Sequence, residues 1–432
     1  MRLRCVLTGV ATIALAAPLQ AQAVISAPAP ATAPTYDDIQ LFYLAHPGLS
    51  VWLGNDDGRA AAAKIVALLK ESRIDGFEQG PQLAASAALA LARGSADDDA
   101  IISTAWVRYV QALKAPVIGV TFGDPTLQPK PPTAGVILSA ATAAPSLSAY
   151  VDSASAVNPL YAALRRTAVA QGQQDDPHVR ATLERLRLIP ATGRVILVDA
   201  ASAELTMLQD GQPVGTMKVI VGKPDFPTPM LASTIHYVTL NPYWHIPEDV
   251  ARRKVAPIVL KRGVKYLKAA RYETVEAFGG DKEVPIDPES IDWKAVAAGE
   301  VDAHIRQLTG PNNMMGKMKF GFANDHGIFL HDTPHKELFD KSKRNLSLGC
   351  VRVERPPQLA EWLFGGPPPI PSDDAEQNVR IGKEGVPIYI SYLTARPDGE
   401  KIAFADDVYK LDGKAGGGSG DKAIATASAA KK

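Results

Sequence analysis

The spacing of apolar residues changes near the middle of this chain, from a helical period to the alternation typical of strands. The clearest helical pattern covers residues 95–114, where apolar residues recur every three or four positions around Trp106 and Tyr109. Asp97, Asp98 and Asp99 fall in its first turn, where the helix dipole favours anions. Similar helical spacing is found over residues 58–76, 158–171 and 177–190. Residues 115–145 are rich in Pro, Gly and Thr and predict a loop, within a helical domain that spans residues 36–188.

After Pro190 the pattern alternates with a period of two, which predicts strands. Residues 194–222 predict three strands, with Asp210-Gly211 as a hairpin turn between the second and third. Further strands are predicted over residues 235–247, 317–322, 327–333 and 386–395. Residues 248–310 are charged and helical in texture, with Trp293 as their main aromatic anchor, and predict an insertion. The fold class is therefore α+β, with a helical N-terminal domain followed by a β-rich domain over residues 189–397.

The two ends of the chain have compositions that do not predict a packed core. Residues 1–23 combine a basic start, a short apolar run and the ending Ala21-Gln22-Ala23, which are the three parts of a secretory signal peptide. Residues 24–35 form an Ala/Pro linker, residues 398–411 a C-terminal extension, and residues 412–432 a low-complexity tail expected to be disordered. We therefore expect an exported, periplasmic protein without a membrane anchor.

Composition and charge exclude some classes of partner. The 432 residues are 46% hydrophobic, enough for two or three domains with sizeable cores. Lysine plus arginine and aspartate plus glutamate number 46 each, so the formal net charge is zero. Without a basic field, nucleic acid and anionic membrane surfaces are poor candidate partners.

Cysteine usage directs attention to one residue. Cys5 lies in the predicted leader, so Cys350 is the only cysteine expected in the mature chain. Exported proteins usually pair their cysteines, and an odd one indicates intermolecular pairing, a reactive thiol or a buried inert side chain.

The residues around Cys350 favour a reactive thiol. His331 follows the strand-like pair Phe329-Leu330 and precedes Cys350 by 19 residues, so a strand and a loop could bring imidazole and thiol together. Cysteine nucleophiles require such a base or a nearby positive charge. Gly349 permits backbone conformations that point N–H groups at an oxyanion, and Arg352 adds a positive charge.

Each of these residues also has a structural interpretation. A lone histidine such as His331 is often a satisfied core residue, and Arg352 could pair with Glu354 or Asp332 at the surface. Zinc is a competing chemical interpretation, because His326, His331, His335 and Cys350 are plausible ligands. However, Pro334 interrupts the spacing between the last two histidines, and the glutamate of a His-Glu-x-x-His helix is missing.

Taken together, the motifs resemble the YkuD-type L,D-transpeptidases, and in particular the larger, scaffold-bearing subgroup. The resemblance is carried by His331 with "SLGCVRV", by "LNPYWHIP", "TGPNNMMGKMKFGF", "FLHDTPHKELFD" and "VPIYISYLTA", and by "NPLYAALRR" at the end of the helical domain. It covers most of residues 36–410 and is densest over residues 190–395.

This resemblance implies a mechanism for peptidoglycan crosslinking. Cys350 would attack the amide between the diamino acid and the terminal D-Ala of a donor stem peptide, and His331 would transfer the protons. Backbone N–H groups of Gly349 and Cys350 would form the oxyanion hole. The acyl group would then pass to the amine of an acceptor stem, with no metal and no organic cofactor, and carbapenems would acylate the same thiol. An insertion over about residues 245–318 would be a lid, and the expected substrate contacts are Arg352, Ser347, Trp244 and Phe329.

The sequence departs from the family pattern in two places. Leu348 stands where the family usually has a second histidine. No small peptidoglycan-binding module, which normally separates the scaffold from the catalytic domain, is recognised, because residues 158–190 run almost directly from one to the other. A 3-3 crosslink is expected, with 1-3 crosslinking, L,D-carboxypeptidase activity and a non-catalytic wall-binding protein as the alternatives. Protein partners and oligomeric state are not predicted.

Overall fold

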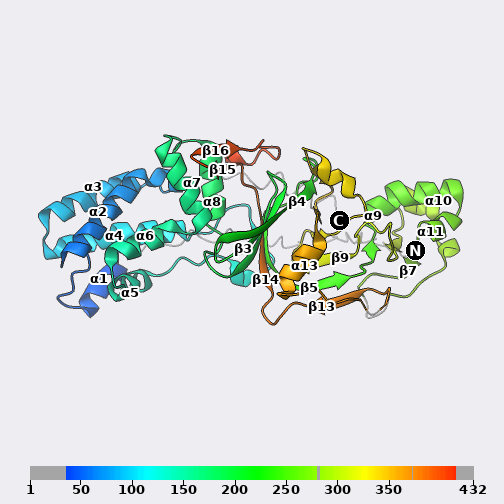
Figure 1. Ribbon diagram of the computed structural model, residues 1–432, viewed down its shortest axis with the longest axis horizontal. Helices are drawn as coiled ribbons and strands as arrows, with labels where there is room; N and C mark the ends of the chain where they lie inside the picture. Colours follow the sequence, from blue (N-terminus) through cyan, green and yellow to red (C-terminus); the bar gives the residue numbers. More distant parts are fainter. Residues whose placement is uncertain (1–35, 280–282, 372, 415–432) are drawn as a thin grey trace, which may run out of the picture.

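The computed structural model describes residues 36–279, 283–371 and 373–414. The predicted leader and the Ala/Pro linker therefore lie outside the described residues, as does most of the predicted tail. Within them, a helical N-terminal domain precedes a β-rich domain, so the predicted α+β fold is confirmed (Figure 1).

The N-terminal domain is a bundle of helices whose apolar faces meet around large aromatic residues. Trp52, Trp106, Tyr109 and Tyr161 are fully buried there. Asp75 is buried among them, and its carboxylate accepts hydrogen bonds from the hydroxyl groups of Tyr109 and Tyr161. The helices are α1 (Tyr36–Ala45), α2 (Asp56–Glu71), α3 (Gly80–Arg93), α4 (Ala96–Leu113), α5 (Ala134–Ala143), α6 (Leu147–Ala156), α7 (Pro159–Ala170) and α8 (Pro177–Leu186).

The predicted loop over residues 115–145 is wrong in its second half, where α5 lies. The side chain of Thr133 caps this helix by accepting from the N–H of Val136, and Ile137 and Leu138 are buried against the bundle. The prolines just before the helix favoured the loop prediction. The helical segment is short, apolar and rich in alanine, and its stability depends on packing rather than on length.

The β-rich domain is built on an 11-stranded sheet within the described residues. Its main path runs β1-β5-β14-β2-β3-β4-β12-β10-β9, and β9 also pairs with β5, so the sheet closes on itself. The predicted hairpin is confirmed, because Asp210 and Gly211 between β3 and β4 both have positive φ angles, of 51° and 72°. The strands are β1 (Thr121–Phe122), β2 (Arg194–Asp199), β3 (Glu204–Gln209), β4 (Gln212–Gly222), β5 (Leu231–Leu240), β9 (Met318–Phe322), β10 (Leu330–His331), β11 (Asn345–Ser347), β12 (Val351–Val353), β13 (Gln377–Arg380) and β14 (Val386–Ser391).

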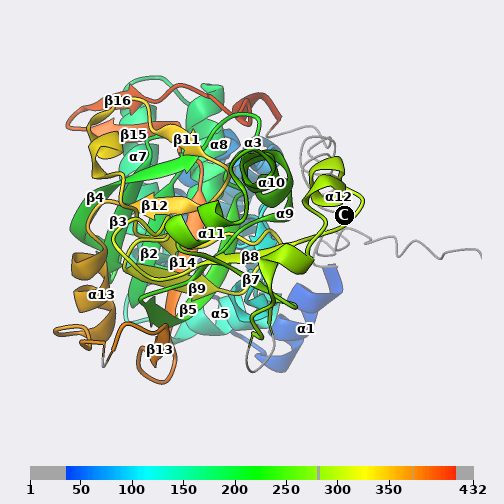
Figure 2. The same cartoon turned by 90° about the vertical axis from the view of Figure 1, so that its right-hand side faces the viewer.

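The segment between β5 and β9 forms a substructure with its own apolar core, which we call the insert. It lies at the opposite end of the molecule from the helical bundle, and the view along the long axis places it in front of the sheet (Figures 1 and 2). It contains β6 (Trp244–His245), α9 (Glu248–Val250), a π-helical turn (Ala251–Val255), α10 (Ala256–Arg262), α11 (Lys265–Ala269), β7 (Tyr272–Val275), α12 (Trp293–Ala298) and β8 (His304–Gln307).

The sequence pattern predicted a helical insert, but the insert also contains strands. Strands β6, β8 and β7 form a three-stranded antiparallel sheet. Its strands are short, so their alternation was too brief to separate from the charged helical texture around them. Trp293 is buried in the insert core, as expected of its main aromatic anchor.

The C-terminal extension joins the two domains. It contains the hairpin of β15 (Ala395–Asp398) and β16 (Lys401–Phe404), which packs beside α7 and α8 (Figure 1). It also runs further than predicted, because Asp412–Lys414 form a 3-10 helix, so the disorder expected from residue 412 is wrong for these residues. The carboxylate of Asp412 accepts hydrogen bonds from His178 Nδ1 at 2.5 Å and Arg185 Nη1 at 2.6 Å, both on α8, and from Thr394. One apolar cluster also contains residues of both domains, so the bundle and the sheet share a core.

Beyond these strands, helix α13 (Pro356–Phe364) follows β12 and packs on the sheet core. Within the described part of the chain, no helix is both long and apolar enough to cross a membrane.

Candidate active site

The predicted histidine lies in a strand that pairs, in parallel, with the strand directly after the predicted cysteine. β10 pairs with β12 so that Leu330 lies opposite Val351 and His331 opposite Arg352. Leu330 and Val351 are fully buried in the sheet core. Because side chains alternate along a strand, His331 and Arg352 point to the other face. Phe329 and Cys350 come directly before the paired residues, and the N–H of Val351 donates to the carbonyl of Phe329 at 3.0 Å.

His331 is held as a neutral imidazole with a defined tautomer. Its Nδ1 lies 2.5 Å from the backbone carbonyl oxygen of Asp332, and a carbonyl only accepts, so Nδ1 carries the proton. Nε2 is then the basic nitrogen. Burial, and secondarily the positive charge of Arg352, lower the pKa of His331 to about 4. At neutral pH this side chain can therefore accept a proton.

Arg352 places a positive charge beside both His331 and Cys350. Its guanidinium interacts electrostatically with both His331 and Cys350, and burial lowers its pKa. Its Nε is buried and has no hydrogen-bond partner among the described residues. A buried guanidinium nitrogen of this kind is suited to an anionic group, and its charge favours the thiolate form of a neighbouring cysteine.

The turn before Cys350 depends on a glycine. Gly349 has a φ of 123°, and a Cβ at this position would lie 3.1 Å from the side chain of Ile328. A side chain here would therefore be strained both by the backbone conformation and by contact. Cys350 itself is partly exposed, with its Sγ 3.6 Å from the carbonyl oxygen of Gly327. Leu348 is exposed beside the turn.

The hydroxyl group of Ser347 is engaged within this turn. Ser347 is buried, and its Oγ donates to the carbonyl of Cys350 at 2.6 Å and accepts from the N–H of Gly349 at 3.1 Å. This arrangement gives Ser347 a role in holding the turn, and its expected contact with substrate stays a prediction. It also occupies the N–H of Gly349.

Thr228 and Tyr409 connect the same turn to the end of β4 through hydrogen bonds. Thr228 is 3% exposed, and its Oγ1 donates to the carbonyl of Gly349 at 2.7 Å and accepts from the N–H of Gly222 at 2.8 Å. The hydroxyl of Tyr409 donates to the carbonyl of Gly222 at 2.6 Å. Because a trans peptide is planar, fixing the Gly349 carbonyl points the N–H of Cys350 in the opposite direction.

Sequence reasoning did not identify these two residues. Thr228 lies between prolines in "FPTP", and Tyr409 lies in the C-terminal extension. The isolated polar residue between two prolines was the only available signal, and it does not reveal a partner 121 residues away.

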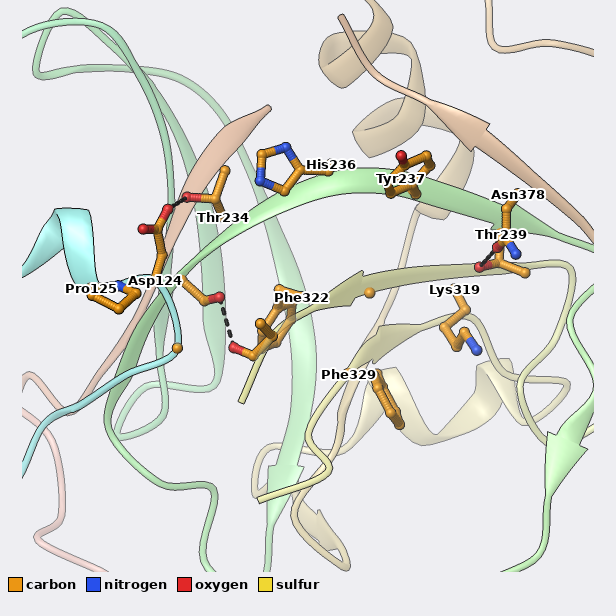
Figure 3. Close-up of a pocket in the computed structure, with 14 residues that line it drawn as sticks. Asp124, Pro125, Thr234, His236, Tyr237, Thr239, Lys319, Phe322, Phe329 and Asn378 are labelled. Atoms are coloured by element: carbon orange, nitrogen blue, oxygen red, sulfur yellow. Dashed lines mark hydrogen bonds between the residues drawn. The ribbon is translucent and has the colours of Figure 1, made fainter. Parts of the chain in front are cut away.

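An open groove begins beside this constellation. It has a volume of about 590 Å³ and is lined by β5, β9 and β13, by Phe329, and by residues 123–125 of the N-terminal domain. In Figure 3, Asp124 and Pro125 lie at one end of the groove, Lys319 lies toward the other end below Thr239 and Asn378, and Phe329 lies below the middle. The Nζ of Lys319 lies 5.3 Å from the centroid of the Phe329 ring.

Other predicted residues are placed elsewhere. Trp244 lies in β6 and packs against the core of the insert. His326 Nε2 lies 3.2 Å from Thr121 Oγ1, and His335 Nδ1 lies 3.4 Å from Glu337 Oε1. Among the residues that the structure describes, no three or more His, Cys, Asp or Glu side chains are grouped as a metal site would require. The sequence-based zinc interpretation therefore lacks a set of ligands in the described part of the chain.

Comparisons with known proteins agree with the two-domain organisation. Residues 193–381 match the family model of the L,D-transpeptidase catalytic domain, YkuD, and residues 37–167 match that of the scaffold domain. A Haemophilus influenzae protein named "Putative L,D-transpeptidase" is 30% identical over 236 residues, which cover 53% of this chain and 47% of that protein. The chain thus spans about half the length of the curated relative it matches.

Solved structures with detectable likeness include two mycobacterial proteins. An L,D-transpeptidase from Mycobacterium smegmatis is 15% identical, covers 46% of this chain and 58% of its own, and has a TM-score of 0.23. L,D-transpeptidase 3 from Mycobacterium tuberculosis, solved with a faropenem-derived adduct, is 15% identical, covers 46% of this chain and 60% of its own, and has a TM-score of 0.24. Superpositions this weak do not assign roles to individual residues.

Proposed function

Because the chain belongs to the YkuD-type L,D-transpeptidases with a scaffold domain, we propose that it crosslinks peptidoglycan stem peptides through an acyl-enzyme on Cys350. The observation that supports this proposal is the pairing of β10 with β12, in which His331 lies opposite Arg352 and Leu330 lies opposite Val351, the residue after Cys350.

In the first half-reaction, Cys350 attacks the carbonyl carbon between the diamino acid and the terminal D-Ala of a donor stem. The Nε2 of His331 accepts the thiol proton, consistent with its protonated Nδ1 and with a ring that the lowered pKa keeps neutral before the reaction. The N–H of Cys350 stabilises the oxyanion, in an orientation fixed by Thr228. The amide C–N bond breaks, His331 returns the proton to the leaving nitrogen, and D-Ala departs.

In the second half-reaction, the amine of an acceptor stem attacks the thioester and gives a proton to His331. The C–S bond breaks, an amide forms, and the thiolate is regenerated. Arg352 stabilises the thiolate and contacts a substrate carboxylate, and Phe329 borders the substrate beside it. The product is a 3-3 crosslink, formed in the periplasm after export by the N-terminal leader, and no metal or organic cofactor takes part.

We further propose that the scaffold comprises residues 36–188, the catalytic domain residues 189–397 and the lid residues 245–318. Asn313 supports a hinge at the base of this lid. It is 1% exposed, and its side-chain amide donates to the carbonyls of Pro242 at 3.1 Å and Gln307 at 3.2 Å. It therefore ties together both connections between the insert and the sheet, and Trp244 lies just beyond the first of them.

The test is incubation of the purified protein with disaccharide-tetrapeptides, followed by chromatography and mass spectrometry of the products. We expect D-Ala release and 3-3 dimers from the wild type and neither from Cys350→Ala. Dimers in which the donor stem keeps only its first residue would identify 1-3 crosslinking. Release of D-Ala without dimers would identify a carboxypeptidase. Peptidoglycan binding without any turnover, unchanged in Cys350→Ala, would overturn the catalytic proposal in favour of a wall-binding protein.

A further inference from the structure

The groove beside Phe329 has no role in the mechanism so far, although it opens next to the reacting residues. We propose that it binds the acceptor stem peptide. Lys319 holds the terminal carboxylate of this peptide, one residue from the diamino acid that supplies the reacting amine, and the N-terminal domain closes the far end of the groove. This inference rests on the proposed function, and it assigns that function a second binding site.

The first argument is position. β10 lies between β12, which follows Cys350, and β9, which forms one wall of the groove. Lys319 of β9 lies opposite His331 in register. The groove is therefore on the histidine side of the thiol. The acceptor amine must approach both the thioester carbon and the base, so it has to arrive from this side.

The second argument is charge. Lys319 is partly buried, and the structure records no ion pair for it among the described residues; its recorded contact is with the ring of Phe329. At the far end, Asp124 accepts hydrogen bonds from Thr126 and from Thr234, and these bonds, that of Thr126 foremost, hold its pKa below the usual value. The groove is thus positive beside the catalytic residues and negative at the bundle.

This polarity matches the acceptor stem. Its terminal carboxylate is one residue from the diamino acid that supplies the amine, so the anionic end belongs beside Lys319. The negative charge of Asp124 disfavours the reversed direction of binding. A volume of about 590 Å³ is also within the range of roughly 300–1,000 Å³ typical of ligand sites, enough for a short peptide segment.

The third argument is shape. Gly321 of β9 lines the groove, and a Cβ built on it would have no atom within 4 Å. Its φ is not in the left-handed region, so neither backbone strain nor packing requires glycine at this position. The absent side chain keeps the groove open, and a large side chain could be introduced there without disturbing the sheet.

The experiment therefore uses Gly321→Leu in the full chain. Gly135→Leu, on α5, is the matched control, because its Cβ would also meet no atom within 4 Å and its φ is also ordinary. Two rates are measured: acylation by a carbapenem, from intact mass, and dimer formation at increasing acceptor concentration. A thermal melt of each variant reports folding.

We expect Gly321→Leu to be acylated at a rate within about twofold of the wild type. Its acceptor concentration for half-maximal crosslinking should rise by about tenfold or more, corresponding to 1.4 kcal/mol of lost binding. The share of hydrolysed donor should rise with it. Crosslinking equal to that of Gly135→Leu at every acceptor concentration would overturn the inference. So would a parallel loss of acylation and crosslinking in a folded Gly321→Leu protein.

Lys319→Gln provides an independent test. The wild type should prefer an acceptor with a free terminal carboxylate over the same peptide with a terminal amide, and Lys319→Gln should lose this preference. A preference unchanged by the substitution would contradict the assignment of Lys319. Absence of any acylation in the wild type would instead contradict the proposed function, so the two failures are distinguishable.

Discussion

Thr228 provides a sharp prediction because its single hydroxyl joins the catalytic turn to the neighbouring strand. Replacing it with valine keeps the shape and removes both hydrogen bonds. The carbonyl of Gly349 and the N–H of Gly222 would lose their recorded partner at a site that is 3% exposed. Each orphaned buried group costs about 1–3 kcal/mol, so the free energy of unfolding should fall by about 2 kcal/mol or more.

The effect on rate is separate from the effect on stability. Without Thr228 the peptide between Gly349 and Cys350 is free to rotate, and the oxyanion donor is no longer aimed. Loss of one oxyanion donor lowers kcat by about 10²–10³, which sets the upper range for Thr228→Val. Thr228→Ser keeps the hydroxyl group and should remain near the wild-type rate.

The assay is the rate of carbapenem acylation by intact mass, at a temperature where circular dichroism shows the variant to be folded. A loss of about 2 kcal/mol should also lower Tm by at least about 4 °C in a domain of this size. A folded Thr228→Val protein that acylates as fast as the wild type would refute the positioning role. Slow acylation by Thr228→Ser as well would show that the hydroxyl is not what matters.

Three further changes have predicted outcomes. Because the pKa of His331 is lowered to about 4 from 6.5, the unfolded chain takes up a proton there that the folded chain does not. The free energy of unfolding should therefore decrease as the pH falls through about 6.5 toward about 4, and urea midpoints should show a smaller decrease for His331→Gln. Asp412→Ala leaves the buried guanidinium of Arg185 unpaired and should lower the free energy of unfolding by about 3–5 kcal/mol, read from urea melts; an unchanged midpoint would show that the extension does not clamp the domains. Asn313→Ala frees the base of the insert, so hydrogen exchange should accelerate at its connections and not in the helical bundle.

The sequence predicted the elements whose stabilisation is local. The helix around Trp106 and the hairpin at Asp210-Gly211 have strong periodicity or turn residues, and both are present. It also paired His331 with Cys350. The structure makes the strand of His331 adjacent to the strand that follows Cys350, and the catalytic pairing itself stays a prediction.

What the sequence could not predict depends on contacts between distant segments. Helix α5 forms because the bundle buries Ile137 and Leu138, and neither its length nor its propensity marks it strongly. The partners of Thr228 and Asp412 lie across the fold, so their spacing in the chain carries no signal. Ser347 was expected to meet substrate, and only the coordinates reveal that its hydroxyl is bonded within the turn.

The central claim is that Cys350 is an activated nucleophile in an acyl-transfer site. The most direct measurement is the intact mass of the protein after incubation with a carbapenem, with peptide mapping, for the wild type and Cys350→Ala. We expect one adduct on the wild type, mapped to Cys350, and none on the variant. A folded wild-type protein that gains no adduct, or an adduct of equal yield on Cys350→Ala, would contradict it.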